Sequence, residues 1–399
     1  MSALDDCFLH DRDRLRHEDA LDLLRALQPV VGTETVRLDE ALDRVLSESV
    51  AAPFDVPGHT NAAVDGYAFA HAGPERAKVS ARITAGSEPS VLATGTAARI
   101  FTGAPVPEGA DTVAMQEDCE ASNGAVSLPP VSRRANVRLR GEDVRRGAEV
   151  MAAGTRLAPA DIATLASFGM DEVNVRKRLK VALFSTGNEL ERTGIGGVRD
   201  SNRPMLKAMA SRLPVDITDG GVLPDDRETV RHALVRAAAD HDMVVTSGGA
   251  SRGEEDHVVA VLDEIGRRKA WQIAVKPGRP LLFGRIGETA FLGLPGNPVA
   301  AFVCFALYAR PTILRLAGAA WSEPERYAVP AGFSLTSKPD RREFLRGRVE
   351  SGRLKKYPRD GSGLISSLRE STGLIEVPEH VTSVAEGDPL AFLPFGALV

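Results

Sequence analysis

Cysteine is scarce in this sequence, and its scarcity excludes two common ways of stabilising a small domain. The chain of 399 residues has three cysteines, Cys7, Cys119 and Cys304, and no two of them lie close together. An odd count without close spacing predicts neither a disulfide framework nor a zinc ribbon. A reducing compartment fits this usage best. Aromatic residues make up only 5% of the chain, so its cores are expected to be rich in Ala, Val and Leu.

Long apolar segments are missing as well. The N-terminal segment MSALDDCFLHDRDRLRHED is charged and has no apolar stretch, so it does not predict a signal peptide. The longest apolar run, residues 299–309, is too short to span a bilayer. The net charge of −5 argues against a general nucleic-acid-binding protein but not against a local basic pocket for a small anion. We expect a cytoplasmic protein that binds neither nucleic acid nor membranes.

Several frequent catalytic signatures are absent. The eight histidines form no H-x-x-x-H arrangement, and no C-x-x-C pair is present. The chain also has no G-x-G-x-x-G fingerprint, no Walker A sequence and no Ser-His-Asp order that defines a triad. Candidate catalytic and binding residues are therefore expected in the loops between the predicted helices and strands.

The length predicts two to four domains, and the patterns along the chain divide it into four. Residues 51–144 consist of short β-like runs between Gly and Pro turns, which predicts a small β-rich domain. Residues 323–399 show a similar pattern and predict a C-terminal β-barrel-like domain. The N-terminal helical and mixed domain is expected to combine residues 1–50 with residues 145–178.

Two segments of this N-terminal domain predict helices. Residues 18–49 carry two apolar stripes at helical spacing, separated by a short break. Residues 158–169 have a proline near their start and Gly169 at their end, with Ile162 and Leu165 on one face. We expect both segments to be helical.

The central part, residues 179–322, has the clearest pattern. Apolar strands alternate with amphipathic helices, which is typical of a three-layer α/β domain with a mostly parallel sheet. Strands are expected at 179–187, 215–223, 243–249, 271–275 and 280–286, followed by the apolar segment TAFLGLPG at 289–296, and helices at 202–213, 225–241, 254–268 and after residue 297. The fold class is therefore multidomain α/β plus β.

Three of these strands end in small or polar residues, namely Thr186 and Gly187, then Ser247, Gly248 and Gly249, then Gly296 and Asn297. In open parallel sheets, ligands bind beyond the carboxyl ends of the strands. Hydroxyls and glycine N–H groups there can form a phosphate cradle. One such loop is better explained as a simple turn, but three loops on one edge predict a small-ligand site.

The stretch LPGNPVAAF, residues 294–302, leads into a buried helix. Pro298 is expected in the first turn, where its missing N–H costs nothing. Asn297 is expected to cap the helix with its side chain. We also expect Asn297 or the Gly296 backbone to face the ligand.

Carboxylates are frequent beside the same strand ends. They are Glu189, the pair Asp225 and Asp226, and the group Glu254, Glu255 and Asp256. Acids at a helix start also interact favourably with the helix dipole, which explains Asp225 and Glu254 without any ligand. Beside a phosphate cradle, carboxylates indicate a divalent cation, most naturally Mg²⁺.

Positive charge is expected near this edge too. Lys276 and Arg279 flank the turn in VKPGRP, where they form either a pair for an oxyanion or ordinary solvated turn residues. Arg346 and the segment GSGLISS, with Ser366 and Ser367, give a weaker indication of an anion contact from the last domain.

Three residues outside the central part lie in loops. Asp65 precedes a glycine in NAAVDGYAF, Thr102 lies in FTGAPVPEGAD, and Asp143 lies in RGED. An ordinary turn explains Asp65 and Thr102, and a solvated loop explains Asp143, so none of the three predicts a site when taken alone.

Seven motifs, in this order, closely resemble the molybdopterin molybdotransferase family, which includes MoeA and the gephyrin E domain. They are NAAVDGYAF, FTGAPVPEGADTVAMQED, LRGEDVRRGAEVMAAGTRLAPADIATLASFG, FSTGNEL, VVTSGGASRGEEDH, KPGRPLLFG and GLPGNPVAAFV. The resemblance covers nearly the whole chain from about Glu18. It implies an elongated homodimer of four-domain subunits that uses Mg²⁺ to insert molybdenum from molybdate into adenylated molybdopterin, with release of AMP. The molybdopterin-adenylating protein is a further candidate partner.

The resemblance also implies roles for the residues above. Asp65, Thr102, Asp143, Glu189, Asp226 and Asp256 would be catalytic, and the acids Glu189, Asp226 and Asp256 would hold the metal. Molybdate would be bound by Lys276 and Arg279, with Arg346, Ser366 and Ser367 completing an oxyanion pocket. The site would lie between the α/β domain of one subunit and the small β domain of the other.

Several positions depart from the family pattern. AAVDGYA replaces the frequent SAMDGYA, and GGASRGEEDH replaces GGVSVGEADY, which introduces Arg252 and His257. Gln272 stands where a lysine is common, and Arg279 replaces a lysine, which keeps the charge but not the shape. The preference between molybdate and tungstate therefore stays open, but the retained acids predict an active enzyme.

Two other functions are compatible with parts of the sequence. The α/β domain alone would allow a molybdopterin adenylyltransferase, and the small β domain with Asp65 and the C-terminal domain argue against it. A non-catalytic scaffold of the same family is the other alternative, and the retained acids argue against that one.

Overall fold

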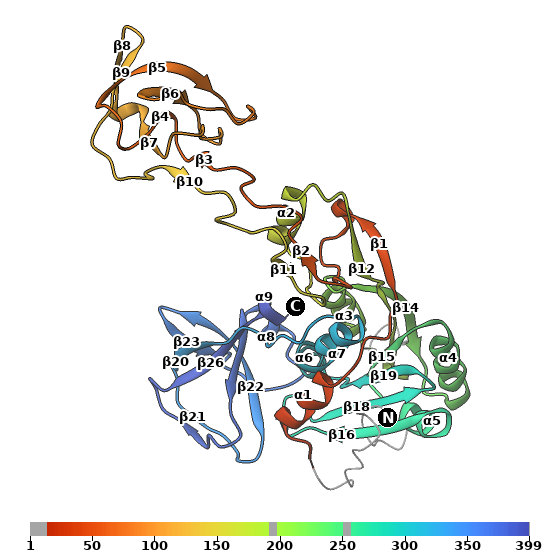
Figure 1. Ribbon diagram of the computed structural model, residues 1–399. Helices are drawn as coiled ribbons and strands as arrows, with labels where there is room; N and C mark the ends of the chain where they lie inside the picture. Colours follow the sequence, from red (N-terminus) through yellow and green to blue (C-terminus); the bar gives the residue numbers. More distant parts are fainter. Residues whose placement is uncertain (1–13, 191–197, 250–256, 399) are drawn as a thin grey trace. The chain divides into compact units, whose positions relative to one another are not determined.

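The computed structural model describes residues 14–190, 198–249 and 257–398. The contacts within the chain divide it into two compact units, shown as ribbons in Figure 1. The smaller unit consists of Ser49–Ala152 and Ala163–Met170, and the larger unit consists of Met1–Glu48, Ala153–Ile162 and Asp171–Val399. The four-domain division stays a prediction, since these two units do not correspond to it one to one.

A six-stranded sheet forms the centre of the larger unit (Figure 1), with the strand order β14-β13-β15-β19-β18-β16. The strands are β13 (Leu179–Thr186), β14 (Val215–Leu223), β15 (Met243–Ser247), β16 (Arg267–Gln272), β18 (Pro280–Ile286) and β19 (Thr289–Leu294). The first four in this order are parallel, and β18 and β16 are antiparallel additions at one edge. The predicted mixed α/β architecture is confirmed.

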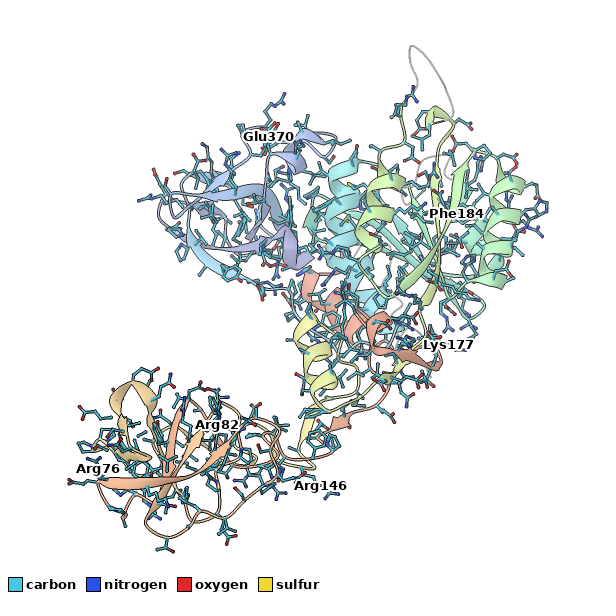
Figure 2. All side chains as sticks on the ribbon, turned by 90° about the horizontal axis from the view of Figure 1, so that it is seen from above. Arg76, Arg82, Arg146, Lys177, Phe184 and Glu370 are labelled. Atoms are coloured by element: carbon cyan, nitrogen blue, oxygen red, sulfur yellow. The ribbon has the colours of Figure 1, made fainter. Side chains whose placement is uncertain are left out.

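Helices cover both faces of this sheet because its strands are apolar on both faces. Neighbouring residues of a strand point to opposite faces, so Leu183 and Phe184, the latter labelled in Figure 2, belong to two different cores. Leu206 of α3 (Asn202–Ala210) packs in the first core. Leu234 of α4 (Arg227–Asp240) and Leu262 of α5 (His257–Ile265) pack in the second.

A continuous helical run follows β19 and packs in the first core. It consists of α6 (Pro298–Cys304), the π-helical turn Phe305–Ala309 and α7 (Arg310–Leu316). Among the residues that the structure describes, this is the one helix long and apolar enough to cross a membrane. Because 78% of its most apolar window is buried inside the fold, it has the environment of a core helix.

The prediction of two helices in residues 18–49 is half wrong. Helix α1 (His17–Arg25) forms and buries Leu21 and Leu24. The second stripe, residues 38–48, follows β1 (Thr33–Arg37). It begins with a 3₁₀ turn, Leu38–Glu40, and continues as irregular chain. Its apolar residues Val45 and Leu46 form bridges to Arg156 and Val175. Pairing with segments distant in sequence has overridden the helical spacing.

Neighbouring residues explain why no helix forms there. Asp43 has a φ of +63°, a left-handed conformation that interrupts a helix. The buried Arg44 donates to the carbonyl oxygen of Arg176 over 2.8 Å and pairs with Glu34. Both acceptors come from the antiparallel pair formed by β1 and β12 (Glu172–Arg176).

The C-terminal part of the larger unit is a curled sheet. Its main strands are β20 (Tyr327–Pro330), β22 (Arg342–Glu350), β23 (Arg353–Lys356), β24 (Gly373–Val377) and β26 (Pro389–Pro394), with the short pair β21 (Leu335–Thr336) and β25 (Ser383–Val384) and the helices α8 (Ser366–Arg369) and α9 (Phe395–Leu398) beside them. A bridge from Ala331 to Leu354 links the end of β20 to β23. The sheet curls around a core that includes Leu345, Ile375 and Phe392.

One strand connects this curled sheet to the central part. Strand β17 (Val275–Lys276) lies in the chain between β16 and β18, and it pairs in parallel with Arg342 and Glu343 of β22. Lys276 therefore lies at the edge of the C-terminal sheet, although it belongs to the α/β segment of the sequence.

The smaller unit contains a second six-stranded sheet, in the order β7-β4-β6-β5-β9-β8. Its strands are β4 (Gly66–Phe69), β5 (Arg76–Ile83), β6 (Thr96–Ile100), β7 (Thr112–Met115), β8 (Glu120–Ser122) and β9 (Ala125–Ser127), accompanied by the 3₁₀ turn Gln116–Asp118 and by the pairs β2 (Val50–Ala51) with β11 (Glu149–Met151) and β3 (Asn61–Ala62) with β10 (Val137–Arg138). Gly66 is required there, since a Cβ would lie 1.8 Å from the Ala114 carbonyl oxygen. The helix predicted over 158–169 is confirmed as α2 (Pro159–Ser167).

Candidate functional site

A hollow of about 380 Å³ in the larger unit contains the predicted cations. Lys276, Arg279 and Arg346 all line it, together with Asn297 and the backbone around Gly361. Lys276 and Arg279 come from the loop between β16 and β18, and Arg346 comes from β22. We call this hollow the anion pocket.

Lys276 is held by a buried carboxylate. Its Nζ lies 3.2 Å from Oε2 of Glu343, whose side chain is 3% exposed. The other oxygen of Glu343 accepts from Nη2 of Arg341 over 2.7 Å. Glu343 therefore orients Lys276 and offsets part of its charge.

Arg346 is held by neutral oxygens. Its Nε donates to Oγ of Ser367 and its Nη2 donates to the carbonyl oxygen of Gly361, both over 3.2 Å. Arg346 is 6% exposed, and this burial lowers the pKa of its guanidinium. Ser367 in turn donates to the Leu364 carbonyl oxygen over 2.6 Å, while the hydroxyl of Ser366 pairs with that of Tyr357 over 3.1 Å. Ser367 thus acts on the pocket through Arg346.

The predicted side-chain cap at Asn297 is wrong. Pro298 does occupy the first turn of α6, but the Asn297 side chain makes no capping hydrogen bond. The backbone N–H of Val299 donates instead to the carbonyl oxygen of Ser362, over 2.9 Å. The Ser362 carbonyl oxygen therefore takes the place of the expected cap, and Asn297 lines the anion pocket.

Two of the predicted strand-end loops lie in direct contact. A Cβ on Gly248 would lie 2.4 Å from Oγ1 of Thr186, and the Gly248 N–H donates to the carbonyl oxygen of Leu294 over 3.0 Å. Gly248 also has a φ of +91°, a left-handed conformation that favours glycine. The ends of β13, β15 and β19 therefore lie side by side, as parallel strands require.

Asn202 joins these loops, and the sequence did not single it out. It is the first residue of α3 and is 8% exposed. Its Nδ2 donates to Oγ of Ser247 over 2.8 Å and to the carbonyl oxygen of Gly296 over 2.7 Å. Its Oδ1 is buried without a hydrogen-bond partner. An amide at the start of an otherwise apolar-faced helix is the signal that could have found it.

The predicted acids occupy the loops after β13 and before α4. Glu189 folds back over Gly187, where a Cβ would lie 2.3 Å from its Oε2. Asp226 caps α4 through Oδ1, which accepts from the hydroxyl and the N–H of Thr229 over 2.6 and 2.8 Å. These bonds, the hydroxyl first, lower the pKa of Asp226.

A reciprocal pair links these two loops. The N–H of Asn188 donates to Oδ2 of Asp225, and the N–H of Asp225 donates to Oδ1 of Asn188, each over 3.0 Å. Asp256, the third predicted metal ligand, lies outside the described residues. Within residues 14–190, 198–249 and 257–398, no three His, Cys, Asp or Glu side chains gather as a metal site.

Asp65 and Thr102 come together in the smaller unit. Oδ1 of Asp65 accepts from the N–H of Thr102 over 2.8 Å and from its hydroxyl over 2.7 Å. These bonds, the backbone one first, lower the pKa of Asp65. Asp143 is exposed, and its N–H donates to the Val56 carbonyl oxygen over 3.1 Å. Of the three predicted residues, the structure therefore joins the first two.

Three family descriptions match the chain in order. They are the MoeA N-terminal region (domain I and II) over residues 15–169, the probable molybdopterin binding domain over 182–315, and the MoeA C-terminal region (domain IV) over 328–395. Among curated relatives, the molybdopterin molybdenumtransferase of Haemophilus influenzae is 34% identical over 94% of this chain and 97% of its own length. That of Synechococcus elongatus is 32% identical over 94% and 98%.

Solved structures give the same result. A molybdopterin biosynthesis MoeA protein from Pyrococcus horikoshii OT3 superposes with a TM-score of 0.81 at 28% identity, covering 96% of this chain and 100% of its own. A second structure of this kind from Pyrococcus has a TM-score of 0.75 at 32% identity, covering 96% and 99%.

Proposed function

Since the chain belongs to the MoeA family of molybdopterin molybdenumtransferases, we propose that it inserts molybdenum from molybdate into adenylated molybdopterin with release of AMP. This is the final step of molybdenum cofactor biosynthesis. The observation that carries the proposal is the anion pocket, where Lys276, Arg279 and Arg346 surround one hollow.

The pocket suits a tetrahedral oxyanion. Charge-assisted hydrogen bonds from guanidinium and ammonium groups to an oxyanion are about twice as strong as neutral ones. The two hydrogen-bond acceptors of Arg346 are neutral oxygens, so its positive charge is offset only in part, by the nearby carboxylate of Asp360, which also lines the pocket. We assign molybdate, as substrate, to this pocket.

The phosphate of the adenylate is assigned to the neighbouring strand ends. Thr186 and Ser247 supply hydroxyls in two adjacent loops, and Gly187, Gly248 and Gly249 allow the backbone of these loops to come close to the phosphate. Gly248 lies too close to Thr186 to carry a side chain. Gly296 and Asn297 connect this cradle to the anion pocket.

The acidic residues fit a magnesium ion in their chemistry. Glu189 and Oδ2 of Asp226 are hard oxygen donors without hydrogen-bond partners among the described residues, and such donors suit Mg²⁺. Glu189, Asp226 and Asp256 would hold the ion. When bound, Mg²⁺ would offset the negative charge of the phosphate.

Asp65 and Thr102 are proposed to act on the substrate from the smaller unit. The lowered pKa of Asp65 keeps the carboxylate ionised, so it can accept a hydrogen bond from the attacking oxygen. In the proposed homodimer these residues act on the substrate that the partner subunit holds. Asp143 is proposed as a further catalytic residue on the family pattern alone.

The test is a reconstitution with purified protein. Adenylated molybdopterin, molybdate and Mg²⁺ should yield AMP and a cofactor that activates an apo-molybdoenzyme. Omission of molybdate should abolish the active cofactor. A protein that releases no AMP under these conditions would contradict the proposal.

The two alternatives have their own readouts. An adenylyltransferase would release pyrophosphate from ATP and molybdopterin, which we do not expect. A scaffold would still support molybdoenzyme activity in a deletion strain after Asp65→Ala.

A further inference from the structure

Gln272 and Arg279 face each other across the base of one loop. Gln272 ends β16 and is paired with Pro280 of β18. The N–H of Ile273 donates to the carbonyl oxygen of Arg279 over 3.1 Å. The loop between them carries Lys276 into the anion pocket.

The two side chains form one hydrogen-bonded unit. Nη2 and Nε of Arg279 both donate to Oε1 of Gln272, over 2.8 and 3.2 Å. One edge of the guanidinium is thereby held, while Nη1 is not engaged in this pair. The two departures from the family motif at 272 and 279 are therefore in contact with each other.

The partner of Arg279 is the neutral amide of Gln272, so the pair keeps the full positive charge of the guanidinium. Elsewhere in the larger unit a half-buried arginine is matched with acids, as Arg342 is with Glu18, Glu376 and Glu379. At the anion pocket, both arginines donate only to neutral oxygens in the part of the chain that the structure describes, although Arg346 also interacts electrostatically with Asp360. Arg279 is oriented without loss of its net charge.

We propose that Gln272 is a positioning residue for oxyanion binding, which orients Arg279 toward the anion pocket and leaves its charge uncompensated. A glutamate at 272 would keep the geometry but neutralise the guanidinium. A lysine there would offer no acceptor and would repel Arg279. This inference rests on the proposed function of the pocket.

The experiment compares two near-isosteric variants of the full chain, Gln272→Glu and Gln272→Met. Molybdate alone is the calorimetric probe, and KM and kcat are taken from AMP release. For Gln272→Glu we expect molybdate Kd and KM to rise about tenfold, with kcat at saturating molybdate unchanged within about twofold. Gln272→Met removes the hydrogen-bond acceptor but leaves position 272 neutral. For this variant we expect molybdate Kd and KM to rise about threefold.

Coupling to Arg279 separates positioning from a general structural role. Arg279→Lys should weaken molybdate binding, and adding Gln272→Met to it should cause little further loss. Gln28→Glu makes the same charge change at an exposed residue whose side chain donates to the Ala26 carbonyl oxygen, and it should bind molybdate as the parent does.

Each outcome decides the inference. Equal molybdate affinity in Gln272→Glu and the parent, additive effects in the double variant, or no molybdate binding by the parent would overturn it. A parent that binds molybdate with the expected pattern of variants, yet releases no AMP, would leave this inference standing and contradict the proposed function.

Discussion

Thr102 donates two hydrogen bonds to a single oxygen of Asp65. The N–H and the hydroxyl both contact Oδ1, over 2.8 and 2.7 Å. A carboxylate that accepts two such donors is favoured in its ionised form. Thr102 therefore sets the protonation state of the residue that we propose to act on the substrate.

Removing the hydroxyl should move the acidic limb of the pH profile. The pKa of Asp65 lies below its ordinary value, so the carboxylate is ionised above that pKa and its charge is lost as pH falls through it. In Thr102→Val one donor disappears, the pKa rises, and the acidic limb of kcat/KM for AMP release should shift to higher pH. Thr102→Ser retains the hydroxyl and should retain the profile. Coincident profiles for all three proteins would contradict the assignment.

Lys276→Met should affect anion binding more than stability. The pocket loses one of its three cations, so KM for molybdate in AMP release should rise at least tenfold, by about 1.4 kcal/mol of binding free energy. Glu343 keeps Arg341 as its partner, so the free energy of unfolding should fall by only about 1 kcal/mol. Lys207→Met removes an exposed lysine that pairs with Asp219 at 3.5 Å, and it should leave KM unchanged. A normal KM in Lys276→Met would remove this residue from the pocket.

Asn202→Asp should destabilise the larger unit. The change replaces a buried donor by an acceptor that faces the Gly296 carbonyl oxygen, so hydrogen bonding is lost and a charge is buried. We expect a loss of about 2–4 kcal/mol, measured as a shift of the urea midpoint. Asn188→Asp is the matched control, because Oδ1 of Asn188 already accepts from Asp225. Equal midpoints for the two variants would show that Asn202 does not hold the loops together.

His17 should make the protein sensitive to acid. It is 1% exposed, its Nδ1 lies 2.7 Å from the Tyr308 hydroxyl, and burial lowers its pKa to about 3. The unfolded chain binds this proton below about pH 6.5, whereas the folded chain does not until about pH 3. The stability that depends on neutral His17 is therefore complete above about pH 6.5 and is lost as pH falls toward 3, at up to about 1.4 kcal/mol per pH unit.

Two substitutions isolate this effect. The unfolding midpoint of His17→Phe should depend less on pH between about 6.5 and 4 than that of the parent. Tyr308→Phe keeps the buried imidazole and should keep the steeper dependence. Parallel curves for the parent and His17→Phe would rule out His17 as the cause.

The sequence was sufficient to predict which residues are neighbours wherever the geometry of the backbone alone brings them together. The carboxyl ends of parallel strands share one edge of a sheet, so the amino-acid pattern alone places Thr186 and Gly248 side by side. It also places the loop 276–279 near them, because the strand that follows this loop belongs to the same sheet. Periodicity misled at 38–48, where bridges to Arg156 and Val175 replaced a helix, and at the end of the helix predicted over 254–268, where residues 267–268 belong to β16.

The rest depends on side chains and loops from distant segments. Asn202 lies 94 residues from Gly296 in the chain, and no local pattern encodes their hydrogen bond. Asn297 has a typical capping sequence, but the Ser362 carbonyl oxygen takes the neighbouring N–H. Gln272 and Arg279 are two separate departures in the sequence, because only the antiparallel pairing of β16 with β18 shows that they meet.

Strand β17 limits how this protein could be divided or recombined. A cut between residues 315 and 328 would separate the two family regions found on either side. It would also leave Val275, which is 4% exposed, without the strand that it pairs with, and Lys276 without Glu343. The C-terminal region, residues 328–395, therefore cannot be exchanged on its own. A chimera that exchanges it would have to exchange the loop 273–279 as well to retain a working pocket.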